Sequence, residues 1–339
     1  MEERRVTIKD IAEELGLSTA TVSNVIHGKT KKISERTIGK VQEKLQESGY
    51  IPNMAAVLLA QNSSKIICVV LSDDVKYDGK MIEDPFVNSV LNGLSKEIAQ
   101  KGYFMMIKEE KNLSNIVKYA SMWNVAGLIL MGYCEIDYDN LRRQMHIPFV
   151  VVDSYKKEVH HYSDVGLDNI RGGELAGDYL IQNGHSKIMY IADNKEGCDF
   201  DRFIGLRKSL NQHGFKIMPN DFKLISVNES TRIEQYNMIF KELENYTAVF
   251  SASDVYAIEF MNFLIDQGLS IPDDFSVIGF DNIPLSNCVR PRLTTISQNM
   301  QQRAKVAVEL LEELINEGIA KTVLLPVSLE IRESIKNIR

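Results

Sequence analysis

The spacing of apolar residues over the first fifty positions predicts three short helices. The first has an apolar stripe at positions i, i+3, i+4 and i+7, formed by Ile8, Ile11, Ala12 and Leu15. Thr7 and Asp10 have the spacing of a capping pair at its start, and Gly16 stands where a helix commonly ends in a left-handed residue. This stretch therefore carries its own start and stop signals.

Two further helices follow with similar signals. Ser18 can cap the second, which ends at residues 27–28, and Ser34 begins the third, which ends at Gly49. Their inward-facing residues are Val22, Val25, Ile26, Ile38, Val41 and Leu45. Two short helices joined by a tight turn that contains glycine form a helix-turn-helix, although three-helix units also occur as purely structural subdomains.

The polar face of the second helix favours contact with nucleic acid over an ordinary solvated surface. Its residues are all small or hydrogen-bonding: Ser18, Thr19, Ala20, Thr21, Ser23 and Asn24. A solvated helix more often carries Glu and Lys, which are better helix formers. Short polar side chains at a helix N-terminus can instead approach a groove and bond phosphates or base edges.

Residues 52–65 predict a break between two domains. Pro52 ends the helical pattern, Asn53 can cap a nearly apolar segment at 54–61, and residues 62–65 have the composition of a linker. A helix of about two turns is marginal by itself. The segment 54–61 is therefore either a strand or core helix of the next domain, or a hinge that orders only against a second copy of the chain and DNA.

From residue 66 onward, short apolar runs rich in β-branched residues alternate with amphipathic helical patterns. The runs lie at 66–71, 127–131, 149–152, 188–192, 248–252 and 276–280, and the helical patterns include 86–101, 172–183, 201–213 and 255–267. Such runs are typical of strands buried on both faces. Regular alternation of strand and helix predicts an α/β fold with parallel sheets, and the length after residue 65 fits two lobes better than one.

Composition excludes several classes of protein. The chain has 339 residues, of which 44% are hydrophobic, and a formal net charge of −7. No apolar stretch approaches the roughly 20 residues of a membrane helix, and the N-terminus has no apolar signal-peptide region. The four cysteines lie far apart, without metal-ligand spacing. We therefore expect a cytoplasmic protein with no membrane span, disulfide framework, metal or cofactor.

The net negative charge does not exclude a nucleic-acid partner, because it is unevenly distributed. Residues 1–61 hold nine Lys/Arg and eight Asp/Glu, a net of +1. The acidic residues gather early in this stretch, and the basic ones follow at Lys29, Lys31, Lys32, Arg36 and Lys40. A local basic patch can attract phosphates while the rest of the protein stays acidic.

Ordered motifs along nearly the whole chain resemble the LacI/GalR family of bacterial transcription regulators. They lie at residues 6–12, 16–24, 50–53, 59, 165–173, 184–185, 279–281, 291–296 and 332–334. The resemblance implies an N-terminal helix-turn-helix domain, a hinge helix and an α/β core of two parallel-sheet lobes, similar to periplasmic binding proteins. It also implies a homodimer or tetramer, and a dimer is expected here because no long leucine-heptad tail follows residue 334.

The domain boundaries expected from this resemblance follow the family's three crossovers between lobes. The DNA-binding domain covers 1–51, and the hinge helix and linker cover 52–65. The N-terminal lobe combines 66–163 with 292–322, and the C-terminal lobe combines 164–291 with 323–339.

The resemblance also assigns roles in binding a pseudo-palindromic, double-stranded DNA operator. Thr19, Ala20 and Asn24 match base-reading positions, and Leu59 matches the family's apolar wedge in the minor groove. Thr7, Ser18, Thr21 and Ser23 match positions that hold phosphates. Asn pairs well with adenine and methyl groups suit thymine, so we expect the second helix to prefer A·T base pairs. The hinge departs from the family pattern at Val57 and Leu58, which leaves open a weaker operator contact or tighter hinge packing.

The same resemblance places a small-molecule effector between the lobes. Arg202 and Asp281 match a pair that holds adjacent hydroxyls of a sugar, because a guanidinium donates two hydrogen bonds and a carboxylate accepts two. Phe86 matches a stacking aromatic, Asp153 ends a strand at the cleft edge, and Ser253 replaces the family's usual Asn. Each also has an ordinary structural interpretation: Arg202 as a solvated helix start and Phe86 as a core residue.

Two sequence features bear on the effector's identity. Nucleobase-responsive relatives carry Arg where this chain has Glu196, which disfavours a purine. The segment between Ser72 and Phe86 is unusually acidic. It is either a solvated loop or part of a site for an amino sugar or another cation.

The leading hypothesis is a repressor released from its operator by a sugar-like effector. One alternative is a regulator whose DNA binding is strengthened by a ligand or a partner protein. From other classes, a solute-binding protein is disfavoured by the helix-turn-helix pattern. An enzyme is disfavoured because G-x-x-x-x-G-K-[ST], G-x-G-x-x-G and G-x-S-x-G are all missing, so no catalytic residue is assigned.

Overall fold

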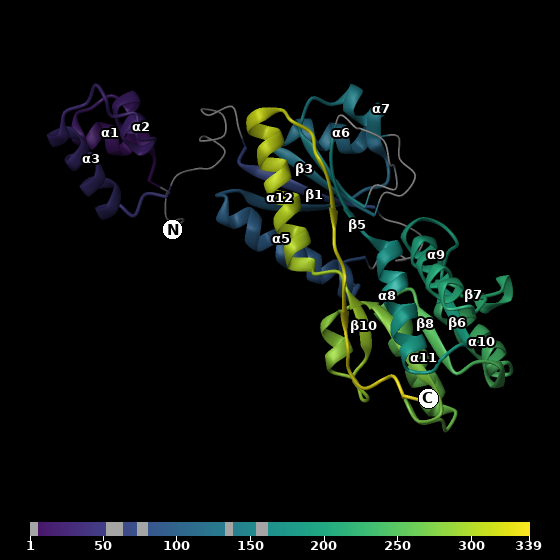
Figure 1. Ribbon diagram of the computed structural model, residues 1–339. Coiled ribbons are helices and arrows are strands. Elements are labelled where there is room, and N and C mark those ends of the chain that lie inside the picture. The colour runs from purple at the N-terminus through teal and green to yellow at the C-terminus, as the bar shows by residue number, and fades with distance from the viewer. Residues whose placement is uncertain (1–5, 52–63, 73–80, 133–137, 154–161) are drawn as a thin grey trace. The chain divides into compact units, whose positions relative to one another are not determined.

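A computed structural model describes residues 6–51, 64–72, 81–132, 138–153 and 162–339 (Figure 1). The chain forms two compact units, residues 1–63 and 64–339. The expected hinge at 54–61, with Val57, Leu58 and Leu59, lies outside the described residues. Within the ranges that are described, no helix is long and apolar enough to cross a membrane.

The N-terminal unit contains three helices: α1 (Ile8–Leu15), α2 (Thr19–Ile26) and α3 (Glu35–Glu47). The predicted caps are confirmed. Thr7 accepts a hydrogen bond from Asp10 N at 3.3 Å while Thr7 N donates to Asp10 Oδ2 at 2.8 Å, and Gly16 ends α1 at φ 65°. The three helices enclose a small buried core of Ile11, Ala12, Val22, Val25 and Val41.

The second unit contains two six-stranded sheets, one in each lobe. The first has the order β11-β5-β4-β3-β1-β2, with every pair parallel. Its strands are β1 (Ile66–Leu71), β2 (Phe104–Glu109), β3 (Gly127–Met131), β4 (Phe149–Val152), β5 (Ser163–Leu167) and β11 (Thr322–Leu325). The continuous apolar runs of β1, β3 and β4 are buried along nearly their whole length, as their composition predicts.

The second sheet has the order β12-β10-β9-β8-β6-β7 and is parallel except for β12, which runs antiparallel to β10. Its strands are β6 (Ile188–Ala192), β7 (Phe222–Leu224), β8 (Ala248–Ser251), β9 (Ser276–Asp281), β10 (Thr294–Ser297) and β12 (Ser328–Glu330). The expected α/β architecture of two mainly parallel sheets is therefore confirmed.

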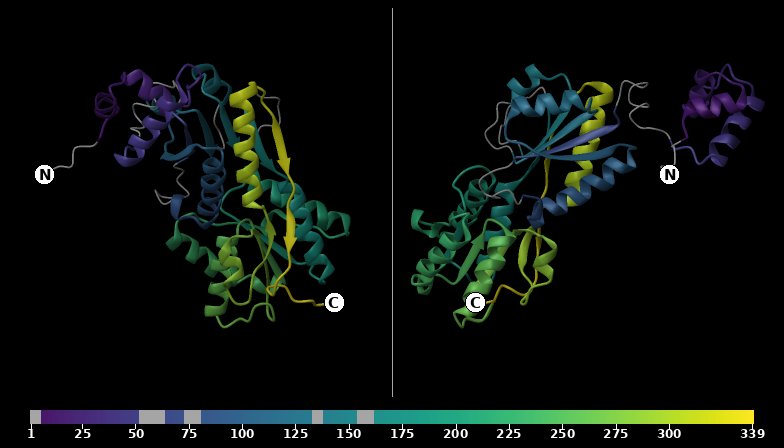
Figure 2. Two further views of the ribbon diagram at one scale, coloured as in Figure 1. Left: turned by 90° about the vertical axis from the view of Figure 1, so that its left-hand side faces the viewer. Right: turned by 180° about the vertical axis from the view of Figure 1, so that it is seen from behind.

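Helices cover the sheets of both lobes (Figure 2). The first lobe carries α5 (Pro85–Gln100), α6 (Leu113–Met122), α7 (Tyr138–Gln144) and α12 (Met300–Glu317). The second carries α8 (Asn169–Gln182), α9 (Gly197–Gln212), α10 (Glu229–Phe240) and α11 (Asp254–Asp266). Short 3₁₀ turns lie at η2 (Met81–Glu83), η3 (Pro219–Asp221), η4 (Leu243–Asn245) and η5 (Pro284–Asn287).

Strand pairing corrects the expected lobe boundaries at all three crossovers. β5 belongs to the first sheet, so the first crossover follows residue 167 and not 163. β10 pairs with β9 in the second sheet, although residues 292–322 were expected wholly in the first lobe. β11 pairs with β5 in the first sheet, although 323–339 was expected in the second. The partner strands, which are distant in sequence, decide these assignments.

Candidate effector cavity and DNA-recognition helix

A cavity of about 320 Å³ lies between the two lobes. Its size falls at the lower end of the range for small-molecule sites. All five predicted effector residues line it: Phe86, Asp153, Arg202, Ser253 and Asp281. The first two come from the first lobe and the others from the second, so the cavity depends on the arrangement of both lobes.

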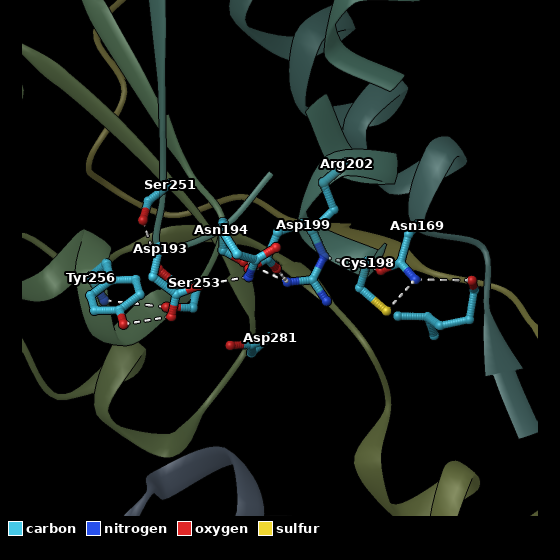
Figure 3. A network of polar contacts seen from close by, with 12 residues as sticks. Asn169, Asp193, Asn194, Cys198, Asp199, Arg202, Ser251, Ser253, Tyr256 and Asp281 are labelled. Atoms are coloured by element: carbon cyan, nitrogen blue, oxygen red, sulfur yellow. Dashed lines mark hydrogen bonds and ion pairs between the residues drawn. The ribbon is translucent and has the colours of Figure 1, made fainter. Parts of the chain in front are cut away.

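Arg202 lies on α9 and is held by three acceptors from different segments. Its Nε donates to Asn169 Oδ1 at 3.0 Å, and its Nη1 donates to Asp199 Oδ1 at 3.1 Å and to the Ala252 carbonyl oxygen at 2.6 Å (Figure 3). Only 7% of the residue is exposed. Among the described residues, none accepts a hydrogen bond from Nη2. The interpretation of Arg202 as a solvated helix start is therefore wrong.

The surroundings of Arg202 keep its side chain charged and place it over an aromatic ring. Its guanidinium carbon lies 3.7 Å from the centroid of Phe280. Burial opposes the charged form, but the carboxylates of Asp199 and Asp281 raise the pKa of Arg202 above its ordinary value. The group is thus a permanent, oriented hydrogen-bond donor at the cavity wall.

Asp281 ends β9 and is 5% exposed. Gln298 Nε2 donates to its Oδ1, and no described residue donates to its Oδ2. Burial raises the pKa of Asp281 well above the ordinary value, although the nearby charge of Arg202 acts in the opposite direction. A buried carboxyl oxygen thus faces a cavity whose wall also carries the guanidinium of Arg202.

The other three predicted residues line the cavity with additional structural roles. Phe86 lies in the first turn of α5 and is half-buried. Asp153 has φ 64° and forms an ion pair with Arg303 on α12. Ser253 is the N-cap of α11, and its Oγ accepts from Tyr256 N at 3.4 Å.

Several residues that support the site were not assigned by sequence reasoning. Asn169 orients Arg202, and Gln298 joins Asp281 to Arg303. Arg232 on α10 forms an ion pair with Glu259, and both line the cavity. Asn169 lies within the motif at residues 165–173, so the sequence contained a signal that could have identified it. Arg303 lies in an amphipathic helix where nothing local distinguishes it from a surface residue.

The α2 helix presents the predicted base-reading residues to solvent. Thr19, Ala20 and Asn24 are exposed. Ser18 Oγ caps the helix by accepting from Thr21 N at 3.1 Å, and the hydroxyls of Ser18 and Thr21 lie 2.9 Å apart. These exposed side chains are available to a DNA groove, while the predicted wedge residue, Leu59, lies outside the described ranges.

Comparisons with known proteins match both units. Residues 7–53 match the model of bacterial regulatory proteins of the lacI family, and residues 178–335 match a periplasmic binding protein-like domain. The regulator MalR of Clostridium butyricum is 30% identical over 347 residues, covering 98% of this chain and 100% of MalR. The repressor PurR of Mannheimia succiniciproducens is also 30% identical, covering 98% and 99%.

Solved structures agree with this assignment. The lac repressor dimer bound to operator and the anti-inducer ONPF is 25% identical, with a TM-score of 0.84, covering 98% of this chain and 100% of that one. A complex of the regulator CelR with cellobiose shares the fold, with 22% identity, a TM-score of 0.71 and coverage of 97% and 100%.

A helix-turn-helix unit joined to a two-lobed binding core defines a transcriptional regulator that binds DNA and responds to a small molecule. The chain belongs to the lacI family of bacterial regulatory proteins, which confirms the resemblance found in its sequence. Members of this family are regulators and not enzymes, and they bind operator DNA and small effectors.

Proposed function

We propose that this regulator is a repressor that leaves its operator when a sugar-like effector binds between the lobes. The observation that carries the proposal is that Nη2 of buried Arg202 and Oδ2 of Asp281 belong to the same cavity and that no described residue bonds either atom. A donor fork and an acceptor carboxylate suit adjacent hydroxyl groups. The cellobiose in the CelR complex supports a sugar-like ligand.

On the DNA side, we propose that a homodimer binds a pseudo-palindromic operator in the bacterial cytoplasm. Thr19, Ala20 and Asn24 read base edges, and Asn24 pairs with adenine. Thr7, Ser18, Thr21 and Ser23 hold phosphates and fix the register of the helix. Leu59 acts as the minor-groove wedge. The dimeric lac repressor complex with operator supports this arrangement.

The effector acts through the arrangement of the lobes. A ligand that touches Phe86 and Asp153 on one lobe and Arg202 and Asp281 on the other binds the closed arrangement more tightly than the open one. It can shift the equilibrium only by that difference in affinity. We propose that closure disfavours pairing of the hinge segments over the operator, so that effector binding and DNA binding oppose each other.

The test separates effector recognition from DNA binding. Arg202→Lys keeps the positive charge but loses the fork, and we expect effector affinity to fall by about 10- to 100-fold, as for lost hydrogen bonds to a charged group. Operator affinity without effector should not change. Both are measured by fluorescence anisotropy on duplexes from the region flanking the gene, with a panel of sugars as the added effectors.

Arg207→Lys is the matched control, because Arg207 is exposed on the same helix. It should respond to the effector as the wild type does. If Arg202→Lys also keeps the wild-type response, the effector does not use this guanidinium. If the wild-type protein binds none of the duplexes, the operator function is wrong.

A further inference from the structure

The effector cavity contains more negative than positive side chains among the described residues. Its carboxylates are Asp84, Asp153, Glu196, Asp199, Glu259 and Asp281, and its guanidiniums are Arg202 and Arg232. A neutral sugar does not require such an excess. Some of these carboxylates form ion pairs within the protein, and others do not.

Three of the carboxylates are paired. Asp199 bonds Arg202, as described above. Glu259 accepts two hydrogen bonds from Arg232, from Nε at 2.7 Å and from Nη2 at 2.9 Å. Asp153 pairs with Arg303, which is 1% exposed and lies behind the cavity wall.

Among the described residues, no cation forms an ion pair with the side chain of any of the other three carboxylates. Asp84 caps α5, where its Oδ1 accepts from Phe86 N at 2.9 Å and from Val87 N at 3.0 Å. Glu196 is exposed at the first residue before α9, and no described residue bonds its carboxylate. Within the described part of the chain, Gln298 is the one hydrogen-bond donor to the side chain of Asp281, and Asp281 shares the charge of Arg202 with Asp199.

We propose that the effector carries a positively charged group, as an amino sugar does, whose counter-charges are Asp281 and Glu196. This rests on the proposed function and adds the charge of the ligand to it. A buried carboxylate without a partner is costly, and a cation that enters the cavity offsets that cost. Hydroxyl groups of the same ligand engage Nη2 of Arg202.

The charged groups around Asp281 determine how its carboxyl group responds to a cation. The groups around it are Arg202 of α9, Asp254 of α11, Asp84 before α5 and Gln298 after β10. Burial raises the pKa of Asp281 above its ordinary value, although the charge of Arg202 acts in the opposite direction. A bound ammonium group lowers this pKa by favouring the carboxylate, so binding releases whatever proton Asp281 holds in the empty site. Calorimetry in two buffers with different ionisation heats measures this release.

Cys198 provides a probe of the cavity's charge that needs no known ligand. It lines the cavity in the first turn of α9, and Asn169 Nδ2 donates to its Sγ at 3.2 Å. The cationic aminoethyl and anionic sulfonatoethyl methanethiosulfonates are compared at low ionic strength, with peptide mass spectrometry to follow each cysteine. At each cysteine we take the ratio of the reaction rate of the cationic reagent to that of the anionic reagent. We expect this ratio to be about fivefold higher at Cys198 than at exposed Cys288, because one nearby negative charge has an effect of that size.

Two variants test the source of this preference. Glu196→Gln should lower the ratio of the two rates at Cys198 by several-fold. Glu244→Gln, at an exposed position that does not line the cavity, should leave the ratio unchanged. A ratio at Cys198 that equals or falls below the ratio at Cys288 overturns the proposal, as does a Glu196→Gln variant that behaves like the wild type.

Matched ligands complete the test. Glucosamine, glucose and N-acetylglucosamine are compared by thermal shift and by release of the operator duplex. Binding of glucosamine at least tenfold tighter than that of glucose, with proton release, supports the proposal. Preferential binding of glucose that still releases DNA overturns the cationic effector and leaves the repressor function intact. If none of the three binds, the thiosulfonate ratios decide.

Discussion

At the scale of single residues, Asp254 shows how burial converts a helix start into a structural junction. It is the first residue of α11, has no exposed surface, and accepts hydrogen bonds from Ile283 N at 3.0 Å and from Ser286 Oγ and Thr295 Oγ1, both at 2.5 Å. Burial raises the pKa of Asp254 to about 6, although these donors oppose the shift. The carboxyl therefore titrates in the folded protein well above its ordinary value.

This shift predicts a pH dependence of stability. The unfolded chain releases the Asp254 proton near pH 4, whereas the folded chain holds it until about pH 6. The contribution of Asp254 to stability is therefore complete below pH 4 and declines as pH rises to 6, by up to about 3 kcal/mol. Urea unfolding of the wild type and Asp254→Asn between pH 4 and 7 measures it. A stability difference that does not change with pH would contradict the assignment.

At the scale of elements, α8 and α9 pack so closely that glycine is required on both. A Cβ atom at Gly173 would overlap the carbonyl oxygen of Arg202, and one at Gly205 would overlap the carbonyl oxygen of Ile170. Neither obstacle is a flexible side chain. The helix contact thus sets the position of Arg202 at the cavity. The neighbouring Gly172 is required for a different contact, because a Cβ atom there would overlap the ring of Phe280.

Gly173→Ala is therefore expected to separate the two helices. Overpacking costs typically about 1–3 kcal/mol, and here backbone must move, so we expect the upper end of that range together with weaker effector binding.

Gly39→Ala in α3 is the opposite case, because its Cβ meets nothing and the position is exposed. It should stabilise the N-terminal unit by about 0.5–1 kcal/mol. Calorimetric unfolding resolves the two effects, and a neutral Gly173→Ala would refute the close packing.

At the scale of the whole molecule, Arg303 joins the lobes through a chain of polar contacts. From α12 it pairs with Asp153 at the end of β4, and its Nη1 donates to Gln298 Oε1 at 2.5 Å. Gln298 in turn donates to Asp281 at the end of β9. The two cavity carboxylates on opposite lobes are thus connected by two intervening side chains.

Removal of Asp153 should therefore be costly for the core unit. Asp153→Asn leaves the charge of Arg303 buried without its counter-ion, and we expect a loss of about 3–5 kcal/mol in the free energy of unfolding. The double variant with Arg303→Met should recover much of it. Glu309→Gln, which breaks an exposed pair with Lys305 on the same helix, should cost less than about 1 kcal/mol. Equal losses of unfolding free energy in Asp153→Asn and Glu309→Gln would show that the buried ion pair stabilises the protein no more than the exposed one.

The amino-acid sequence by itself determined the features that depend on neighbouring residues. The caps at Thr7, Ser18 and Ser34 and the continuous apolar strands are local, because a cap bonds within one turn and a doubly buried strand needs apolar residues throughout. Motifs also located Arg202 and Asp281. Only the tertiary structure decided which lobe holds β5, β10 and β11, because those short strands are placed by hydrogen bonds to distant partners. The tertiary structure also decided the burial of Arg303, because a buried guanidinium is stable only when it is paired with a carboxylate such as that of Asp153.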